Sequence, residues 1–317
     1  MRYYSTNKQA PVVTLAEAVV KGLAPDNGLY MPEKIHVLPD AFFKNIGEMT
    51  LQEISYVVAN TLFGEDVDSE MLRNIVYDAL SFEIPLVKVD DNKYTLELFH
   101  GPTLAFKDVG ARFMARMLGY FNSVNDDKRP VNVLVATSGD TGSAVANGFI
   151  GVEGVRVFVL YPSGKVSAIQ ESQFTTLGEN VFAIEVNGTF DDCQALVKKA
   201  FLDEELNSQH KLTSANSINI ARFMPQMFYY FYAYSQLAKK GENLDSIVVS
   251  VPSGNFGNIT AGLIGKRMGL PIKRFIAANN VNDVFYNYWR TGVYEAKPSV
   301  QTIANAIGWL VLCVISF

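Results

Sequence analysis

The sequence is organised around the stretch Leu98-Phe99-His100-Gly101-Pro102-Thr103-Leu104-Ala105-Phe106-Lys107-Asp108. An alternating strand pattern from Tyr94 to Phe99 stops at Gly101-Pro102, a dipeptide that favours a turn. Lys107 then stands at the start of a helical pattern that continues through Phe113. Burial among the neighbouring aromatic side chains favours the neutral amine, which is the nucleophile that forms a Schiff base. A solvated lysine that opens a helix is the alternative.

The composition is that of an ordinary soluble globular protein. Of the 317 residues, 49% are hydrophobic and 19% are charged, and the net charge of −5 argues against a nucleic-acid partner. Cys193 and Cys313 lie far apart, which predicts a reducing compartment rather than a disulfide framework. The three histidines show no metal-ligand spacing, so we expect no metal site. The N-terminus has no apolar signal segment and no apolar run is long enough to span a membrane, which predicts a cytoplasmic protein.

Patterning along the chain predicts an α/β protein with a helical N-terminal region. Apolar spacing in residues 1–92 predicts helices over Leu15–Val20, Leu51–Phe63 and Ser69–Leu80. From residue 93 to 306, short β-branched runs alternate with helical patterns; the predicted strands are Val131–Ala136, Val155–Leu160, Val181–Val186, Ile247–Val251 and Phe275–Ala278. Such alternation is typical of mostly parallel sheets covered by helices.

Two small-residue loops each follow a predicted strand and precede a predicted helix. The loop Thr137–Ser143 carries hydroxyl groups and backbone amides, and its Asp140 repels phosphate, so it suits a substrate carboxylate, with Asp140 turned toward a donor. A tight turn packed by small residues is the alternative. The loop Ser253–Asn258 has no nearby carboxylate and suits a bound phosphate. Neither loop fits the dinucleotide fingerprint G-x-G-x-x-G.

A third polar stretch opens the long helix predicted over Ile218–Lys239. Asn216 or Ser217 is placed to cap that helix, and capping alone is one explanation of both residues. Arg222 near a helix start faces an unfavourable dipole, which an anionic ligand would offset. A lysine that burial makes nucleophilic, a loop that suits phosphate and a second anion site together predict pyridoxal 5'-phosphate chemistry.

Four segments resemble the threonine synthase family of fold type II pyridoxal-phosphate enzymes. They are ELFHGPTLAFKDVGARF at 97–113, ATSGDTGSA at 136–144, SANSINIAR at 214–222 and VPSGNFGN at 251–258. The resemblance runs from the N-terminus to about Ala306 and implies the fold type II architecture.

The resemblance implies a role for each motif residue. Lys107 is the expected catalytic and Schiff-base lysine, and Asp140, where many relatives have asparagine, flanks the cofactor ring. The expected cofactor phosphate loop consists of Gly254, Asn255, Phe256, Gly257 and Asn258. The substrate carboxylate is expected at Ser138, Gly139 and Thr141, and the substrate phosphate at Asn216, Ser217 and Arg222.

The implied reaction converts O-phospho-L-homoserine and water to L-threonine and phosphate. A serine/threonine dehydratase or a β-replacement enzyme is the alternative within the same cofactor chemistry; only a phosphorylated substrate needs the second anion pocket. Residues 307–317 form a divergent apolar tail, and family members extend well beyond this chain. These features predict an incomplete core, poor solubility or oligomerisation, and little activity, so an inactive truncated fragment is the remaining alternative.

Overall fold

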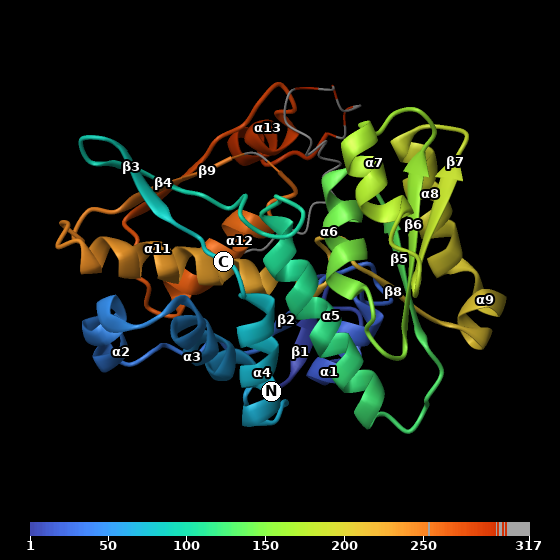
Figure 1. The fold of residues 1–317 in the computed structure, drawn as a ribbon, viewed down its shortest axis with the longest axis horizontal. Helices are drawn as coiled ribbons and strands as arrows, with labels where there is room; N and C mark the ends of the chain where they lie inside the picture. Colours follow the sequence, from blue (N-terminus) through green and yellow to red (C-terminus); the bar gives the residue numbers. More distant parts are fainter. Residues whose placement is uncertain (253, 296, 298–299, 301, 303–317) are drawn as a thin grey trace.

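Four parallel strands form the principal sheet, in the spatial order β7-β6-β5-β8. The computed structural model describes residues 1–252, 254–295, 297, 300 and 302 (Figure 1). The strands are β5 (Val131–Ala136), β6 (Val155–Pro162), β7 (Val181–Val186) and β8 (Lys211–Ser214). Patterning predicts the first three, with a shorter β6, and misses β8, whose sequence KLTS is too short and polar to stand out. The fold class predicted from the sequence is confirmed.

The side chains of alternate residues of β5 lie on opposite faces of this sheet. Val133 and Val135 belong to the main hydrophobic core, whereas Leu134 and Ala136 pack in a separate cluster with Cys193 of α8. Helices therefore cover both faces, with α6 and α8 on opposite sides (Figure 1). The helices of this part are α6 (Asp140–Phe149), α7 (Ala168–Thr175), α8 (Phe190–Leu202) and α9 (Glu204–Gln209). Helices α8 and α9 meet at Asp203, which ends the first and caps the second.

The N-terminal region is largely helical, as the apolar spacing predicts. Its helices are α1 (Leu15–Lys21), α2 (Asp40–Asn45), the 3-10 helix η1 (Ile46–Glu48), α3 (Leu51–Phe63) and α4 (Ser69–Ala79). Reciprocal hydrogen bonds between Thr14 and Glu17 and between Thr50 and Glu53 cap α1 and α3. Two antiparallel pairs complete it: β1 (Tyr3–Ser5) with β2 (Tyr30–Pro32), and β3 (Leu86–Asp90) with β4 (Lys93–Leu96). The strand predicted to reach Phe99 thus ends at Leu96.

Helix α5 (Lys107–Val124) crosses the middle of the molecule and anchors the central motif. Its Phe113 is fully buried between α3 and α11, with ring centroids 5.7 Å from Phe63 and 6.0 Å from Phe228. Burying one such ring stabilises the fold by about 1.5–3 kcal/mol. The N-terminal turn of α5 is therefore held by a rigid core.

The helix predicted over Ile218–Lys239 is interrupted in the structure. It consists of α10 (Ile220–Phe223), the 3-10 helix η2 (Met224–Gln226) and α11 (Met227–Lys239). Pro225 has no amide hydrogen to donate, which breaks a regular helix at that point. The cap is Asn219, whose Oδ1 accepts from the Ala221 amide at 3.0 Å, so the prediction that Asn216 or Ser217 caps this helix is wrong.

A second parallel pair lies apart from the principal sheet. It comprises β9 (Val248–Val251) and β10 (Arg274–Ala277), joined through α12 (Gly257–Arg267) and followed by α13 (Val284–Thr291). Within the described part of the chain, no helix is long and apolar enough to cross a bilayer. The predicted tail at 307–317 lies outside the described residues, and the domain boundary after residue 92 stays a prediction.

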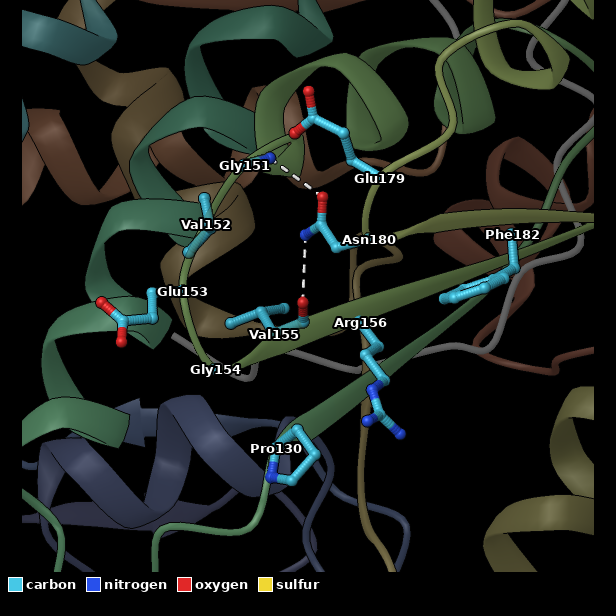
Figure 2. Close-up of a pocket in the computed structure, with 10 residues that line it drawn as sticks. All are labelled: Pro130, Gly151, Val152, Glu153, Gly154, Val155, Arg156, Glu179, Asn180 and Phe182. Carbon is cyan, nitrogen blue, oxygen red and sulfur yellow. Dashed lines mark hydrogen bonds between the residues drawn. The ribbon is translucent and has the colours of Figure 1, made fainter.

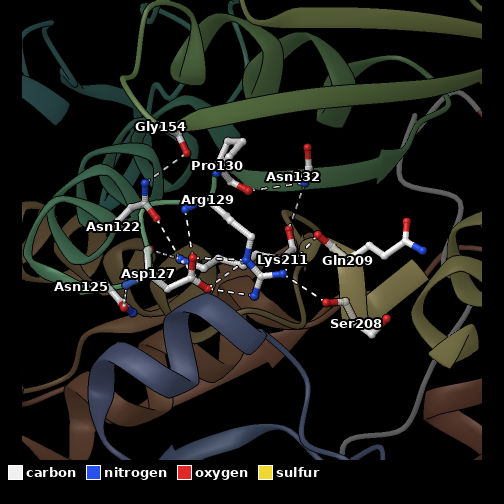
Figure 3. Close-up of polar contacts among 10 residues, drawn as sticks. All are labelled: Asn122, Asn125, Asp127, Arg129, Pro130, Asn132, Gly154, Ser208, Gln209 and Lys211. Carbon is white, nitrogen blue, oxygen red and sulfur yellow. Dashed lines mark hydrogen bonds and ion pairs between the residues drawn. The ribbon is translucent and has the colours of Figure 1, made fainter. Parts of the chain in front are cut away.

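The amino-terminal edge of the principal sheet is tied together by charged side chains (Figure 3). Arg129 donates to both carboxylate oxygens of Asp127 and to the carbonyls of Ser208 and Gln209. Lys211 lies 3.5 Å from the same carboxylate. Hydrogen bonds from Arg129 hold the pKa of Asp127 well below its ordinary value. This cluster joins the segment before β5 to the segment before β8.

Candidate active site

Lys107 is the first residue of α5, and its amine is largely withdrawn from solvent. The side chain is 15% exposed, and Nζ lies 3.8 Å from Oδ2 of Asp140. Burial lowers the pKa of Lys107 to about 8, with Arg222 acting in the same direction and Asp140 opposing it. About one-tenth of this amine is therefore neutral at pH 7, far more than for a lysine in water, and the neutral form is the nucleophile.

Buried Arg222 fixes the backbone of Lys107. Its Nη1 donates to the Lys107 carbonyl at 2.8 Å and its Nε to the Ala215 carbonyl at 3.2 Å. Gly110 makes this approach possible, since a Cβ there would lie 2.6 Å from Nη1. The expectation that Arg222 opposes a helix dipole is wrong, because it lies in the last turn of a four-residue helix.

The turn before Lys107 is closed by Asp108. This buried carboxylate accepts from the amide of Thr103 at 3.0 Å and from the Thr103 hydroxyl. Burial raises the pKa of Asp108, and the two Thr103 hydrogen bonds oppose that shift. Leu104 adopts a left-handed backbone with φ of 59° inside this turn. Asp108 thus holds a strained turn that delivers Lys107 to the start of α5.

The first small-residue loop is stabilised from within by Thr137. Its Oγ1 accepts from the amides of Gly139 and Gly142 at 2.9 and 2.8 Å. The Gly139 amide is thus used inside the loop. Helix α6 begins at Asp140, inside the predicted loop Thr137–Ser143, which places Asp140 and Thr141 in its first turn. Asp140 is turned toward two donors, the Gln170 side-chain amide and the Lys107 amine.

The second small-residue loop leads into the eleven-residue helix α12. Phe256 takes the left-handed conformation, with φ of 59°, directly before the helix. Asn258 Nδ2 donates to the Pro252 carbonyl at 3.1 Å and closes the loop. Among the described residues, a Cβ at Gly254 would meet only Asn258 Nδ2, at 3.9 Å, and Asn255 is exposed. The first amides of a helix lack intrahelical acceptors and attract anions, so this open loop suits phosphate.

The second loop lies against the segment that contains Asn216 and Arg222. A Cβ on Gly257 would be 3.7 Å from Cβ of Ser217 and 3.3 Å from Cβ of Phe223. Nearby, Oδ1 of Asn216 is buried and has no hydrogen-bond partner within the described part of the chain. The fold therefore brings the predicted motifs together: Asp140 and Arg222 contact Lys107, and Ser217 adjoins the Gly257 loop.

A separate cavity of about 430 Å³ lies at the amino-terminal edge of the principal sheet, away from the loops that follow its strands (Figure 2). It is lined by residues that precede or begin β5, β6 and β7, including Glu153, Arg156 and Glu179. These three charged side chains point in different directions and do not converge on a common point (Figure 2). In the described residues, no cluster of histidine, cysteine or acidic side chains suits a metal ion.

Family comparisons identify the class of this site. A family model for "Pyridoxal-phosphate dependent enzyme" matches residues 86–311, so the chain is a pyridoxal-phosphate-dependent α/β enzyme. A second model, for the N terminus of threonine synthase, matches residues 2–80. The chain is 48% identical to the threonine synthase of Haemophilus influenzae, with 97% of this chain and 70% of the relative covered. The chain belongs to the threonine synthase family.

Solved structures agree with this assignment. The crystal structure of Escherichia coli threonine synthase matches with a TM-score of 0.87 at 43% identity, over 97% of this chain and 70% of that one. The pyridoxal-phosphate-bound threonine synthase of Brucella melitensis matches with a TM-score of 0.89 at 38% identity, over 97% and 66%. Pyridoxal phosphate is thus the cofactor, as the motifs predict.

The residues present fit this cofactor. A buried lysine with a lowered pKa suits covalent attachment to an aldehyde, and the open loop at Gly254 suits a phosphate. Sequence reasoning did not identify Gln170 and Tyr229, although both contact residues of the site. Gln170 contacts Asp140, and the Tyr229 hydroxyl donates to the Phe106 carbonyl. Neither belongs to a short motif, and no local signal marks them.

The lowered pKa of Lys107 makes stability depend on pH. Between pH 8 and 10.5 the unfolded lysine holds a proton that the folded one has released, so the folded state gains stability as pH rises. We expect the free energy of unfolding of the cofactor-free chain to rise across this range by about 3 kcal/mol more than that of Lys107→Met. Urea unfolding at successive pH values measures the difference. Parallel pH profiles for the two chains would contradict the assigned environment.

Proposed function

We propose that the chain converts O-phospho-L-homoserine and water to L-threonine and phosphate. The observation that carries the proposal is that the second small-residue loop lies against the segment with Ser217 and Arg222, and that this segment contacts the buried Lys107. The Gly257 end of the second loop abuts Ser217, and Arg222 contacts the Lys107 backbone at 2.8 Å. A phosphorylated substrate needs an anion place in addition to the one that holds the cofactor phosphate. The names of the similar proteins support the same activity.

In this proposal, the chain's own groups hold and orient the cofactor. Lys107 binds it covalently and Asp140 faces its ring. The loop formed by Gly254, Asn255, Phe256, Gly257 and Asn258 holds its phosphate at the start of α12. When bound, pyridoxal phosphate supplies an electron sink for charge that develops on the substrate.

The remaining motif residues receive the substrate. Ser138 and Thr141 hold its carboxylate beside Gly139, and Asn216, Ser217 and Arg222 hold its phosphate. Oδ1 of Asn216, which has no partner among the described residues, is an acceptor and suits an ordered water or a donor group of the substrate rather than its phosphate. The Lys107 amine moves protons at Cα and Cβ. Phosphate leaves from Cγ, this carbon takes up a proton to become the methyl group of threonine, and water adds its hydroxyl at Cβ. The proposal includes the cytoplasmic location that the composition predicts.

Product analysis tests the reaction directly. We expect the chain, loaded with pyridoxal phosphate, to release inorganic phosphate from O-phospho-L-homoserine and to form threonine in equal amount. Ammonia release from L-threonine is the matched control and is expected to be absent. Ammonia release without phosphate release would favour the dehydratase alternative. Absence of both activities, together with absence of bound cofactor, would favour the inactive-fragment alternative.

A further inference from the structure

Gln170 connects α7 to the residue pair at the centre of the site. It lies in the first turn of α7, which stands beside α6 (Figure 1). Its side-chain Nε2 donates to Oδ1 of Asp140, the first residue of α6. The other carboxylate oxygen of Asp140 faces the Lys107 amine. One carboxylate is thus shared between an amide from α7 and an amine from α5.

The orientation of the Gln170 amide is set by Ser167, the N-cap of α7. The Ser167 hydroxyl oxygen accepts from the Gln170 backbone amide at 3.4 Å and donates to its side-chain Oε1 at 3.1 Å. With Oε1 accepting, Nε2 is the atom left to donate to Asp140. The Ser143 hydroxyl also donates to the Gln170 carbonyl at 3.1 Å, which ties this turn of α7 to α6.

The neighbouring loop leaves room for this contact at Gly139. A Cβ at residue 139 would lie 2.3 Å from Oε1 of Gln170 and 2.6 Å from its Cδ. Gly139 also has a φ of 142°, a conformation that side-chain-bearing residues rarely adopt. The Gln170 side chain therefore occupies the space that any other residue at 139 would need.

The Asp140 carboxylate is close enough to pair with the Lys107 amine but stops short of a direct hydrogen bond. Oδ2 of Asp140 is 3.8 Å from Nζ, beyond the 2.7–3.2 Å of a direct hydrogen bond. We infer that Gln170 is a positioning residue, whose amide tethers the Asp140 carboxylate and keeps it from closing onto the Lys107 amine. The inference rests on the proposed function insofar as Lys107 is the lysine that takes the cofactor.

This tether bears on the charge state of Lys107. Among the described residues, Asp140 on α6 and Arg222 on α10 are the charged groups that act on this amine. A carboxylate that closes to direct contact favours the ammonium form and raises the pKa by about one unit. At pH 7, an amine with a pKa near 8 is about one-tenth neutral, and a rise of one unit leaves about one-hundredth neutral. Cofactor capture would then slow about tenfold.

The reactivity of the Lys107 amine tests the tether without cofactor or turnover. Trace acetic anhydride acetylates the neutral amines of the cofactor-free chain at successive pH values, and mass spectrometry of the Lys107 peptide gives its titration midpoint. We expect Gln170→Met, which keeps the side-chain length but removes the donor, to raise this midpoint by about one pH unit. Gln173→Met, the same change on the same helix, is expected to leave it unchanged.

A double-mutant cycle separates the tether from a general packing effect. If Gln170 acts through the carboxylate, Gln170→Met has no effect on the Lys107 midpoint in an Asp140→Asn background. If Gln170→Met lacks a cooperative thermal transition, Gln170→Asn takes its place, since its shorter amide cannot reach Asp140. A midpoint that is unchanged or lower in the Gln170 variant, or an equal shift in the Asp140→Asn background, overturns the inference. Failure of the proposed function would appear separately, as cofactor bound to a lysine other than Lys107.

Discussion

Lys107→Ala is expected to abolish covalent attachment of pyridoxal phosphate and to reduce threonine formation by at least about a thousandfold. No other described group combines an amine with this burial and the contacts to α6 and α10. Loss of the amine removes both the covalent anchor and the group proposed to move protons on the substrate. Visible absorbance of the loaded chain, and the mass of the Lys107 peptide after borohydride reduction, measure the first effect.

Lys165→Ala is the matched control for this experiment. Lys165 is exposed and precedes α7, and we expect its replacement to leave cofactor absorbance and turnover unchanged. A reduced adduct recovered on a different lysine in the Lys107→Ala chain would refute the assignment of Lys107.

Arg222→Ala is expected to lower stability and substrate affinity together. Two carbonyls lose charged donors in a buried environment, which costs about 1.5–3 kcal/mol in free energy of unfolding. Affinity for O-phospho-L-homoserine is expected to fall about ten- to a hundredfold, since the proposed contact of the guanidinium with the substrate phosphate would be lost. Urea unfolding measures the first effect, and titration of the substrate or its phosphonate analogue measures the second.

Arg222→Lys separates the two roles of this side chain. Lysine keeps the positive charge but cannot donate to both carbonyls in the geometry of a guanidinium. We therefore expect part of the substrate affinity to return while the stability loss largely remains, with cofactor absorbance preserved in both variants. Unchanged substrate affinity in Arg222→Ala would remove Arg222 from the proposed phosphate site.

The sequence by itself determined the elements whose signals are local. Thr14 and Gly22 are the N-cap and C-cap of α1, and the apolar run at 131–136 matches β5. Lys107, which starts α5, and the two small-residue loops were also evident in the sequence, because turn residues and apolar periodicity act within a few residues. Their order along the chain was enough to predict the fold class and the cofactor.

Only the tertiary structure decided how these elements cooperate. Asn219 caps α10 rather than Asn216 or Ser217, and its side chain also donates to the Val19 carbonyl, a contact across 200 positions of sequence. Arg222 is committed to the Lys107 carbonyl, and Gln170 reaches Asp140 from a different helix. All three have partners distant in sequence, and Arg222 and Gln170 also need the space left by a glycine, Gly110 for Arg222 and Gly139 for Gln170. Such contacts form only after helices pack, so no local pattern encodes them.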